Sequence, residues 1–276
     1  MSNQQNTTAM AEYKPFSLPA PMDDSFDSKE VAKDLEGLEL SFPRVKIPGG
    51  GVPQFKMPGE DPDHPTYVSE IEGIILYNHD ANAYWPEGSE YDDNTPPQCQ
   101  SLDGKQGYGD PGLVCAGCGY NQFGSNGNGK GKACKNMRML YILQDGEFMP
   151  LQLALPPTSI KPFRNFAGMA FGLRRRPIYG SLVRITLKPV SSNGFDYSVT
   201  AFNRVRDFTG EELAGVRAYA ENFRGIIEEM QKRQAEEQQT ADIVVPEDAA
   251  DLPDLPDNDE HFSVGILDGE REPLLA

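Results

Sequence analysis

Short segments in which apolar and polar residues alternate dominate the middle of the chain, and this period of two is typical of β-strands with one buried face. The alternation is clearest at Val183, Ile185 and Leu187, which are separated by polar residues. The second and third of the five predicted strands are joined by a link containing Asp145-Gly146, which indicates a β-hairpin. The predicted strands are residues 67–77, 137–143, 151–155, 182–188 and 195–202.

Two segments have the longer period of an α-helix. Pro156-Pro157-Thr158-Ser159 ends a strand and offers an N-cap, and a helix is predicted from there to about Phe171, with Gly172 at its end. A second helix is predicted over 208–238, where Thr209-Gly210-Glu211-Glu212 has the form of a capping box. Its apolar residues recur every three or four positions. This spacing suits either packing on the body of the protein or a short coiled coil that forms a homo-oligomer.

The two ends of the chain lack the composition of a packed core. Residues 1–40 are polar with few large apolar side chains, and a disordered N-terminal segment is predicted there. Residues 239–276 combine acidic residues with several prolines, and a disordered acidic tail is predicted. No apolar stretch reaches the roughly 18 residues of a transmembrane helix, and residues 1–21 do not resemble a secretory signal. A cytoplasmic location is therefore expected.

The charged residues are unevenly distributed along the chain, so the net charge of the whole chain does not describe its parts. The formal net charge is −17, but 13 acidic residues and only one basic residue lie between Ala235 and the last residue. Between Cys99 and Lys188 there are 12 basic residues and 4 acidic ones, a net charge of +8. A basic body with an acidic tail favours a polyanion as the partner of the body.

The chain contains four cysteines, which lie close together in the sequence: Cys99, Cys115, Cys118 and Cys134. Two thiolates separated by two residues can reach one ion, and four thiolates form the closed tetrahedral shell of a structural Zn²⁺. Gly, Asn and Pro are frequent around them and apolar residues are scarce, so a metal would supply stabilisation that burial cannot. Zinc is the predicted cofactor. An iron–sulfur cluster, two disulfides and unligated thiols remain as alternatives.

These patterns together predict a mainly β fold with added helices. The strands, with one helix between them and many turns, fit a small barrel of the OB type, with a zinc-binding insertion, a C-terminal helix and disordered termini. The barrel domain is predicted over 41–207, and its zinc-binding insertion over 94–136.

Basic and aromatic side chains accompany the cysteines and the predicted barrel. Lysine and arginine bind phosphates by charge, and rings stack on bases without regard to sequence, so both are candidates for nucleic-acid binding. Each also has a structural alternative, because rings cover metal sites or enter cores and a run of arginines can form a solvated face. The candidates are Tyr120, Phe123, Lys130, Lys132, Lys135, Arg138, Lys161, Arg164, Arg174, Arg175, Arg176, Tyr179, Arg184 and Lys188.

Three features occur together: the cysteine region ending Gly-Lys-Gly-Lys-Ala-Cys134-Lys, the element Leu155-Pro156-Pro157-Thr158-Ser159, and the strand from Tyr179 to Val190. Over roughly residues 42–205 they resemble the single-stranded-DNA-binding proteins of bacteriophages and mobile elements. The resemblance implies an OB fold, sequence-tolerant binding of single-stranded DNA in replication and recombination, and a bacterial host cell as the location. It also implies that the acidic tail recruits replication and recombination proteins.

The chain departs from this family in two respects. Members that carry zinc in the OB domain use Cys and His ligands, whereas here no histidine lies near the cysteines. The bacterial tail ends in Pro-Phe, whereas this chain ends Pro273-Leu274-Leu275-Ala276, which puts recruitment of the host's tail-binding proteins in doubt.

No sequence feature points to catalysis. His64 and His79 lie far from any nucleophile motif, and the acidic residues concentrate in the tail, where no pocket can shift their pKa values. The protein is therefore expected not to be an enzyme. Two other functions stay open: a zinc-ribbon protein that binds proteins or regulates transcription, and an RNA-binding protein.

Overall fold

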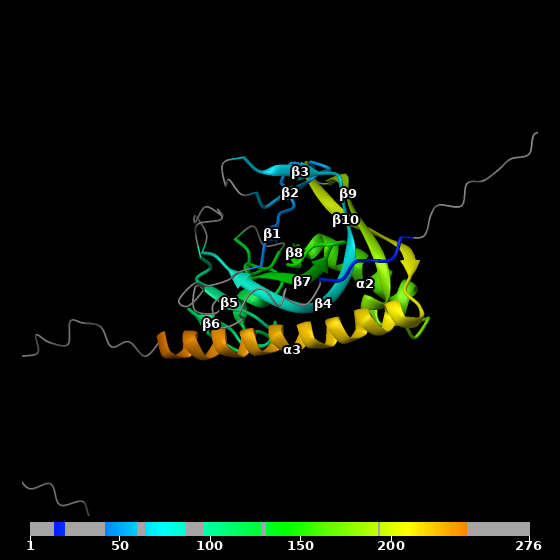
Figure 1. The fold of residues 1–276 in the computed structure, drawn as a ribbon. Helices are drawn as coiled ribbons and strands as arrows, with labels where there is room; N and C mark the ends of the chain where they lie inside the picture. Colours follow the sequence, from blue (N-terminus) through cyan, green and yellow to red (C-terminus); the bar gives the residue numbers. More distant parts are fainter. Residues whose placement is uncertain are drawn as a thin grey trace, which may run out of the picture. The chain divides into compact units, whose positions relative to one another are not determined.

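The computed structural model describes residues 14–19, 42–59, 64–86, 96–127, 131–192 and 194–241, and they belong to the compact unit that ends at Asp242. This part is mainly β, with a curled sheet and a long C-terminal helix (Figure 1). The strands are β1 (Arg44–Val45), β2 (Phe55–Met57), β3 (Thr66–Val68), β4 (Glu70–Tyr84), β5 (Cys99–Ser101), β6 (Tyr108–Gly109), β7 (Lys135–Leu143), β8 (Leu151–Leu155), β9 (Ser181–Ser192) and β10 (Phe195–Asp207). The helical elements are η1 (Gly119–Asn121), α2 (Pro157–Ala167), η2 (Gly168–Gly172), η3 (Ile178–Gly180) and α3 (Gly210–Ala241). No helix among the described residues is long and apolar enough to cross a membrane.

The long strand β4 organises the sheet because it pairs along both of its edges. β7 lies antiparallel along one edge, from Ile74 opposite Leu143 to Ala83 opposite Lys135. On the other edge, β9 pairs with the start of β4, and β5 pairs with its end. β8 pairs with β7, β1 joins β8 in parallel, and β9 and β10 form a hairpin. The predicted strands are thereby confirmed, although β4 runs further than the predicted 67–77.

Side chains on the inner face of the curled sheet form the first of two cores. Val183, Ile185 and Leu187 of β9 are buried there, so the predicted alternation is confirmed. α2 contributes to the same core through Phe163, whose ring centroid lies 5.3 Å from that of Phe202 in β10. The helix therefore covers the inner side of the sheet.

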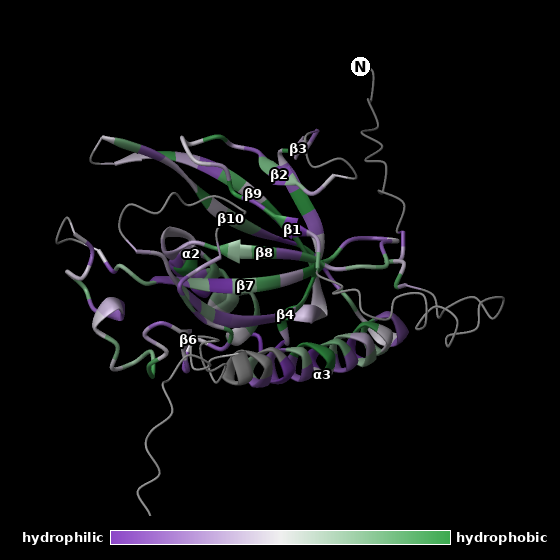
Figure 2. Cartoon of the chain, turned by 90° about the vertical axis from the view of Figure 1, so that its left-hand side faces the viewer, coloured by the Kyte–Doolittle hydropathy of each residue, from purple (hydrophilic) through white to green (hydrophobic). Residues whose placement is uncertain are grey.

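The second core lies on the opposite face of β4 and β7, beneath α3. Val216, Ala220 and Ile227 of α3 are buried in one cluster with Ile74 and Leu143 of the sheet. In Figure 2, α3 lies along this sheet with hydrophobic and hydrophilic residues on different sides. The sequence left two roles open for the apolar residues of α3, packing on the body or a coiled coil, and the structure shows packing on the body.

The structure corrects the expected N-cap of the helix that follows β8. α2 begins at Pro157, with Pro156 at the N-cap position, so Ser159 is not a cap. Ser159 is instead fully buried, and its hydroxyl accepts a hydrogen bond from the backbone N–H of Thr200 over 3.1 Å. The apolar pattern placed the helix correctly, but no side chain among the described residues caps it, because the Ser159 hydroxyl binds a strand distant in the sequence.

Six residues of the N-terminal stretch for which disorder is predicted pack on the body. Phe16 is 9% exposed, and its ring meets that of Phe208 edge-on with centroids 5.9 Å apart. Its backbone N–H donates to the Glu212 carboxylate over 2.9 Å. One aromatic ring in a polar stretch thus anchors residues 14–19 to α3 and to the connection that precedes it.

Two glycines differ in the space around them, and this gives a stability prediction. A Cβ at Gly168 would meet no atom within 4 Å, and Gly168 has helical φ and ψ of −62° and −49°. We expect Gly168→Ala to raise the free energy of unfolding by about 0.4–1 kcal/mol, because alanine loses less backbone entropy on folding. A Cβ at Gly73 would lie 2.5 Å from the carbonyl oxygen of Leu143, so we expect Gly73→Ala to lower it by about 1–3 kcal/mol. Urea denaturation of the two variants measures both, and equal shifts would contradict the packing described.

Candidate metal centre and nucleic-acid interface

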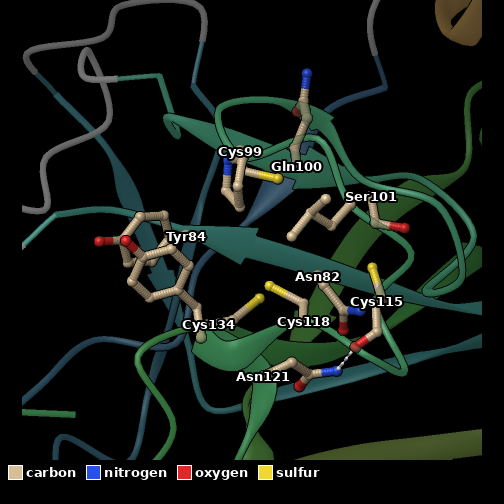
Figure 3. A pocket seen from close by; sticks show the side chains of 12 residues that line it. Asn82, Tyr84, Cys99, Gln100, Ser101, Cys115, Cys118, Asn121 and Cys134 are labelled. Carbon is tan, nitrogen blue, oxygen red and sulfur yellow. Dashed lines mark hydrogen bonds between the residues drawn. The ribbon is translucent and has the colours of Figure 1, made fainter. Parts of the chain in front are cut away.

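The four cysteines come from different elements of one segment of the chain and line one small cavity. Cys99 begins β5, Cys115 and Cys118 precede η1, and Cys134 directly precedes β7. The cavity has a volume of about 20 Å³, which is room for one water-sized occupant. Figure 3 shows the four side chains around this space. The structure therefore brings all four predicted ligands together.

Amide side chains attach the cysteine segment to the sheet. The Asn121 side chain donates to the backbone carbonyl of Cys115 over 2.8 Å, the dashed line in Figure 3. Asn136 of β7 donates to the side-chain oxygens of both Asn82 and Asn121, over 2.6 and 2.9 Å. The backbone N–H of Cys134 donates to the carbonyl of Tyr120 over 2.9 Å. This network fixes the knuckle between Cys115 and Cys118 against β4 and β7.

The cysteine segment has almost no apolar core of its own. Within the described residues 96–127 and 131–134, the buried positions are Ser101, Gly107 and three of the four cysteines, Cys115, Cys118 and Cys134. A Cβ at Gly107 would lie 3.0 Å from the Cys99 sulfur and 2.9 Å from the carbonyl oxygen of Leu113, so the loop is wound closely around that thiol. The burial of side chains therefore contributes little to the stability of this segment.

The electrostatics of the cavity disfavour several uncompensated thiolates. Burial, reinforced by the neighbouring cysteines, raises the pKa of Cys134 to about 11. Burial also raises the pKa of Cys99. The four cysteines are free thiols. As placed, no three His, Cys, Asp or Glu side chains in the described part of the chain form a metal-holding group. A bound divalent cation would reverse the pKa shifts by compensating the thiolate charges.

An aromatic and cationic surface adjoins the cysteines. Tyr120 stacks on Tyr84 of β4 with ring centroids 4.3 Å apart and planes inclined by 18°. Phe123 is 83% exposed, and the ammonium group of Lys132 lies 5.2 Å from the centre of its ring. Lys135 is exposed and donates to the backbone carbonyl of Lys132 over 3.4 Å. An exposed ring and an exposed lysine thus stand beside the half-buried Lys132, which also donates to the side-chain oxygen of Asn121 over 3.0 Å. Rings and cations together are the combination that stacks bases and holds phosphates.

Two further candidates of this region, Arg138 and Lys130, are not part of this exposed surface in the described residues. Arg138 is committed to β4, because it donates to the side-chain oxygen of Asn78 and forms an ion pair of 2.8 Å with Asp80. Lys130 lies outside the described residues.

The arginine run 174–176 is largely used within the fold. Arg174 forms an ion pair with Asp207 over 2.5 Å, and Arg176 donates to the backbone carbonyls of Gly180 and Phe208. Arg175 is exposed, has a φ of 52°, and has no partner among the described residues. Of this run, only Arg175 is therefore without a partner in the described part of the chain.

The remaining candidates differ in how far the fold uses their side chains. Arg184 of β9 lies between two carboxylates, at 3.5 Å from Glu70 and 2.7 Å from Glu72, so its charge is compensated. Tyr179 packs against the core beneath α3. Lys161, Arg164 and Lys188 are exposed. The alternation of β9 indicated correctly which residues face outward, but it carried no information on their partners.

Asp207 is the hub of the arginine cluster. Besides Arg174, its carboxylate accepts from the Ser181 hydroxyl over 2.6 Å and lies 3.0 Å from Arg204 and 3.6 Å from Arg176. The hydrogen bond from Arg174 is the main reason that the pKa of Asp207 lies far below its usual range, and burial opposes this only in part.

Asp207→Asn is therefore expected to lower the free energy of unfolding at neutral pH by about 1–3 kcal/mol, because several donors lose their charged acceptor. The folded-state pKa is depressed, so this stabilisation is present above the unfolded value of about 3.9 and is lost as pH falls below it. Denaturation measured between neutral and acidic pH should show that the difference in the free energy of unfolding between the wild type and the variant shrinks as the pH falls. A gap independent of pH would contradict this role.

Sequence reasoning missed several residues that build the site. Tyr84 supports Tyr120 by stacking, and Asn82, Asn121 and Asn136 orient the segment. Tyr84, an aromatic residue at the end of a long strand close to the first cysteine, could have been identified from the sequence as a neighbour of the site. The three asparagines have no common spacing, so nothing short of the fold brings them together.

No family model, no curated protein and no solved structure matches this chain.

Proposed function

We propose that this chain is a single-stranded-DNA-binding protein whose cysteine segment is organised by a structural zinc ion and carries the DNA-binding surface. One observation carries the proposal: the exposed ring of Phe123 and the cation of Lys132 stand together on the cavity-lining cysteine segment. Stacking on rings and phosphate contact by lysine tolerate any base sequence.

The order of strand pairing supports an OB-type barrel. The first three strands of such a barrel, β4, β7 and β8, form a meander, α2 follows, and β9 returns to pair with β4 before β10. Loops between the first and second strands of OB folds contribute to oligonucleotide binding. The cysteine segment occupies this position, between β4 and β7. On this assignment it is a zinc-binding insertion in the barrel's first loop.

The donor set fits zinc. Cys99, Cys115, Cys118 and Cys134 would hold the ion as thiolates, and four sulfur ligands leave no position for catalysis. Bound zinc supplies the cohesion that the segment lacks in apolar contacts. The chain's own residues then orient the site, with Asn121 on the knuckle and Tyr84 beneath Tyr120.

The DNA-binding surface in this proposal is narrower than the set of candidate residues. It consists of Tyr120, Phe123, Lys132 and Lys135, with Phe195, which is 75% exposed at the β9–β10 turn, as a further ring for stacking. Arg174, Arg176, Arg184 and Tyr179 are excluded because the fold uses them. We place replication and recombination as the setting. The acidic residues after Asp242, which lie outside the described part, are proposed to recruit partner proteins.

A titration of fluorescein-labelled oligo-dT with the zinc-loaded full chain, monitored by anisotropy, tests the function. The proposal expects saturable binding and weak competition by duplex DNA and by RNA. The logarithm of the binding constant should fall linearly with the logarithm of the salt concentration, with a slope of about −0.7 for each phosphate contact. Duplex or RNA that competes as well as unlabelled oligo-dT would overturn it.

A further inference from the structure

The surface of α2 and η2 that faces away from the sheet carries two large aliphatic side chains. Met169 is 69% exposed and Leu173 is 75% exposed, and they lie four residues apart on a helical stretch. Phe163 and Phe171 of the same stretch are buried in the inner core. Phe163 and Phe171 thus supply the contacts of this stretch with the core, and Met169 and Leu173 do not contribute to it.

Glycines flatten the surface beside these side chains. Gly168 and Gly172 are exposed, and a Cβ at Gly168 would meet no atom within 4 Å. A second chain can therefore bring its backbone close to the helix at this point while its side chains contact Met169 and Leu173.

The surroundings of the aliphatic pair are cationic. Residues 157–180 contain five basic residues and no acidic one. Lys161, Arg164 and Arg175 are exposed, and the described part of the chain offers them no ion pair. Arg174 keeps 42% of its side chain exposed although it pairs with Asp207.

This chemistry differs from that of the cysteine segment. The rings of the stretch are turned inward, with Phe166 stacked on Phe202 with centroids 5.4 Å apart and Tyr179 in the second core. A surface of cations and aliphatic groups without an exposed ring offers no aromatic side chain on which bases stack, but it can bind carboxylates and aliphatic side chains together.

We propose that the exposed face of α2 and η2, formed by Lys161, Arg164, Gly168, Met169, Leu173 and Arg175, is a docking surface for an acidic peptide segment with aliphatic side chains in a partner protein. The charge complementarity selects an acidic partner, and the aliphatic pair provides the anchors. This surface is separate from the proposed DNA-binding site and does not depend on it.

The test uses the zinc-loaded full chain and a short fluorescein-labelled peptide of Asp and Leu, with anisotropy as the readout. Replacing both Met169→Ser and Leu173→Ser should weaken peptide binding at least about tenfold, since each anchor buries an aliphatic side chain. Lys161→Glu with Arg164→Glu should weaken it about tenfold, and more at low salt than at high salt. A matched control is Ile226→Ser with Arg217→Glu, an exposed aliphatic residue and an exposed cation on α3, which should leave binding unchanged.

Peptides with Asn in place of Asp, or Ser in place of Leu, should bind about tenfold more weakly than the parent. Oligo-dT affinity is measured on the same variants, and Met169→Ser with Leu173→Ser should leave it unchanged. Loss of oligo-dT binding in that variant, with displacement of the peptide by oligo-dT, would assign the face to nucleic acid and overturn the proposal. Dimers in sedimentation that this variant abolishes would assign the face to a second copy of the chain, and the proposal would fall in that case too. Absence of saturable peptide binding would overturn it as well, while leaving the DNA-binding function intact.

Discussion

Replacing Cys115→Ser and Cys118→Ser together is expected to reduce bound zinc from one ion per chain to none. The remaining two thiols cannot complete the four-sulfur shell. The segment between β5 and β7 should then lose its structure, because its buried positions are largely the cysteines themselves. Structural zinc contributes on the order of 10 kcal/mol in small zinc-binding units, which no apolar contact in this segment can replace.

The body of the protein should survive this change. The cores on the two faces of β4 and β7 contain none of the cysteines, so the β-sheet and α3 are expected to remain folded. Elemental analysis of untagged protein gives the zinc content, and circular dichroism reports the body. Val114→Ser, at a 59% exposed position beside Cys115, serves as the matched control and should keep its zinc. A wild-type protein without zinc, or a double variant that retains it, would contradict the metal site.

Removing the ring of Phe123 is expected to weaken oligo-dT binding about tenfold to a hundredfold. Stacking of one base on an aromatic ring contributes about 1–3 kcal/mol. The ring is 83% exposed, so Phe123→Ala should leave stability and zinc content nearly unchanged. The loss would then belong to binding and not to the fold.

The matched control is Phe148→Ala, because Phe148 is also exposed, at 64%, but lies in the β7–β8 connection, beyond the opposite end of β7 from Cys134. Its oligo-dT affinity should equal that of the wild type. Lys135→Ala should weaken binding and reduce the salt slope by about 0.7, the contribution of one phosphate contact to a single strand. Equal effects of Phe123→Ala and Phe148→Ala would show that the cysteine segment is not the stacking surface.

Local patterns in the sequence predicted much of the secondary structure. The alternation at Val183, Ile185 and Leu187, the Asp145-Gly146 turn, and the seam of α3 are all properties of neighbouring residues, and the structure has a strand, a hairpin and a helix at these places. The four cysteines were also grouped correctly from the sequence, because all of them line one cavity, and their binding of zinc stays a prediction.

The features that the sequence did not reveal depend on contacts between distant residues. Arg184 and the run 174–176 look alike as exposed cations, yet Glu70 and Glu72 compensate the first and Asp207 holds part of the second. The packing of Phe16 on Phe208 likewise joins segments about 190 residues apart. Spacing along the chain cannot distinguish a paired arginine from a free one, which is why the set of candidate residues was wider than the surface that the structure supports.

Ultraviolet cross-linking of oligo-dT to the zinc-loaded protein, followed by mass spectrometry of the cross-linked peptides, tests the central claim most directly. That claim is that single-stranded DNA lies on the cysteine segment. The account predicts cross-links at Tyr120 and Phe123, with a weaker site at Phe195, and their loss when the zinc ion is removed. Cross-links confined to other exposed rings, such as Tyr67 or Phe148, with none on the cysteine segment, would contradict it.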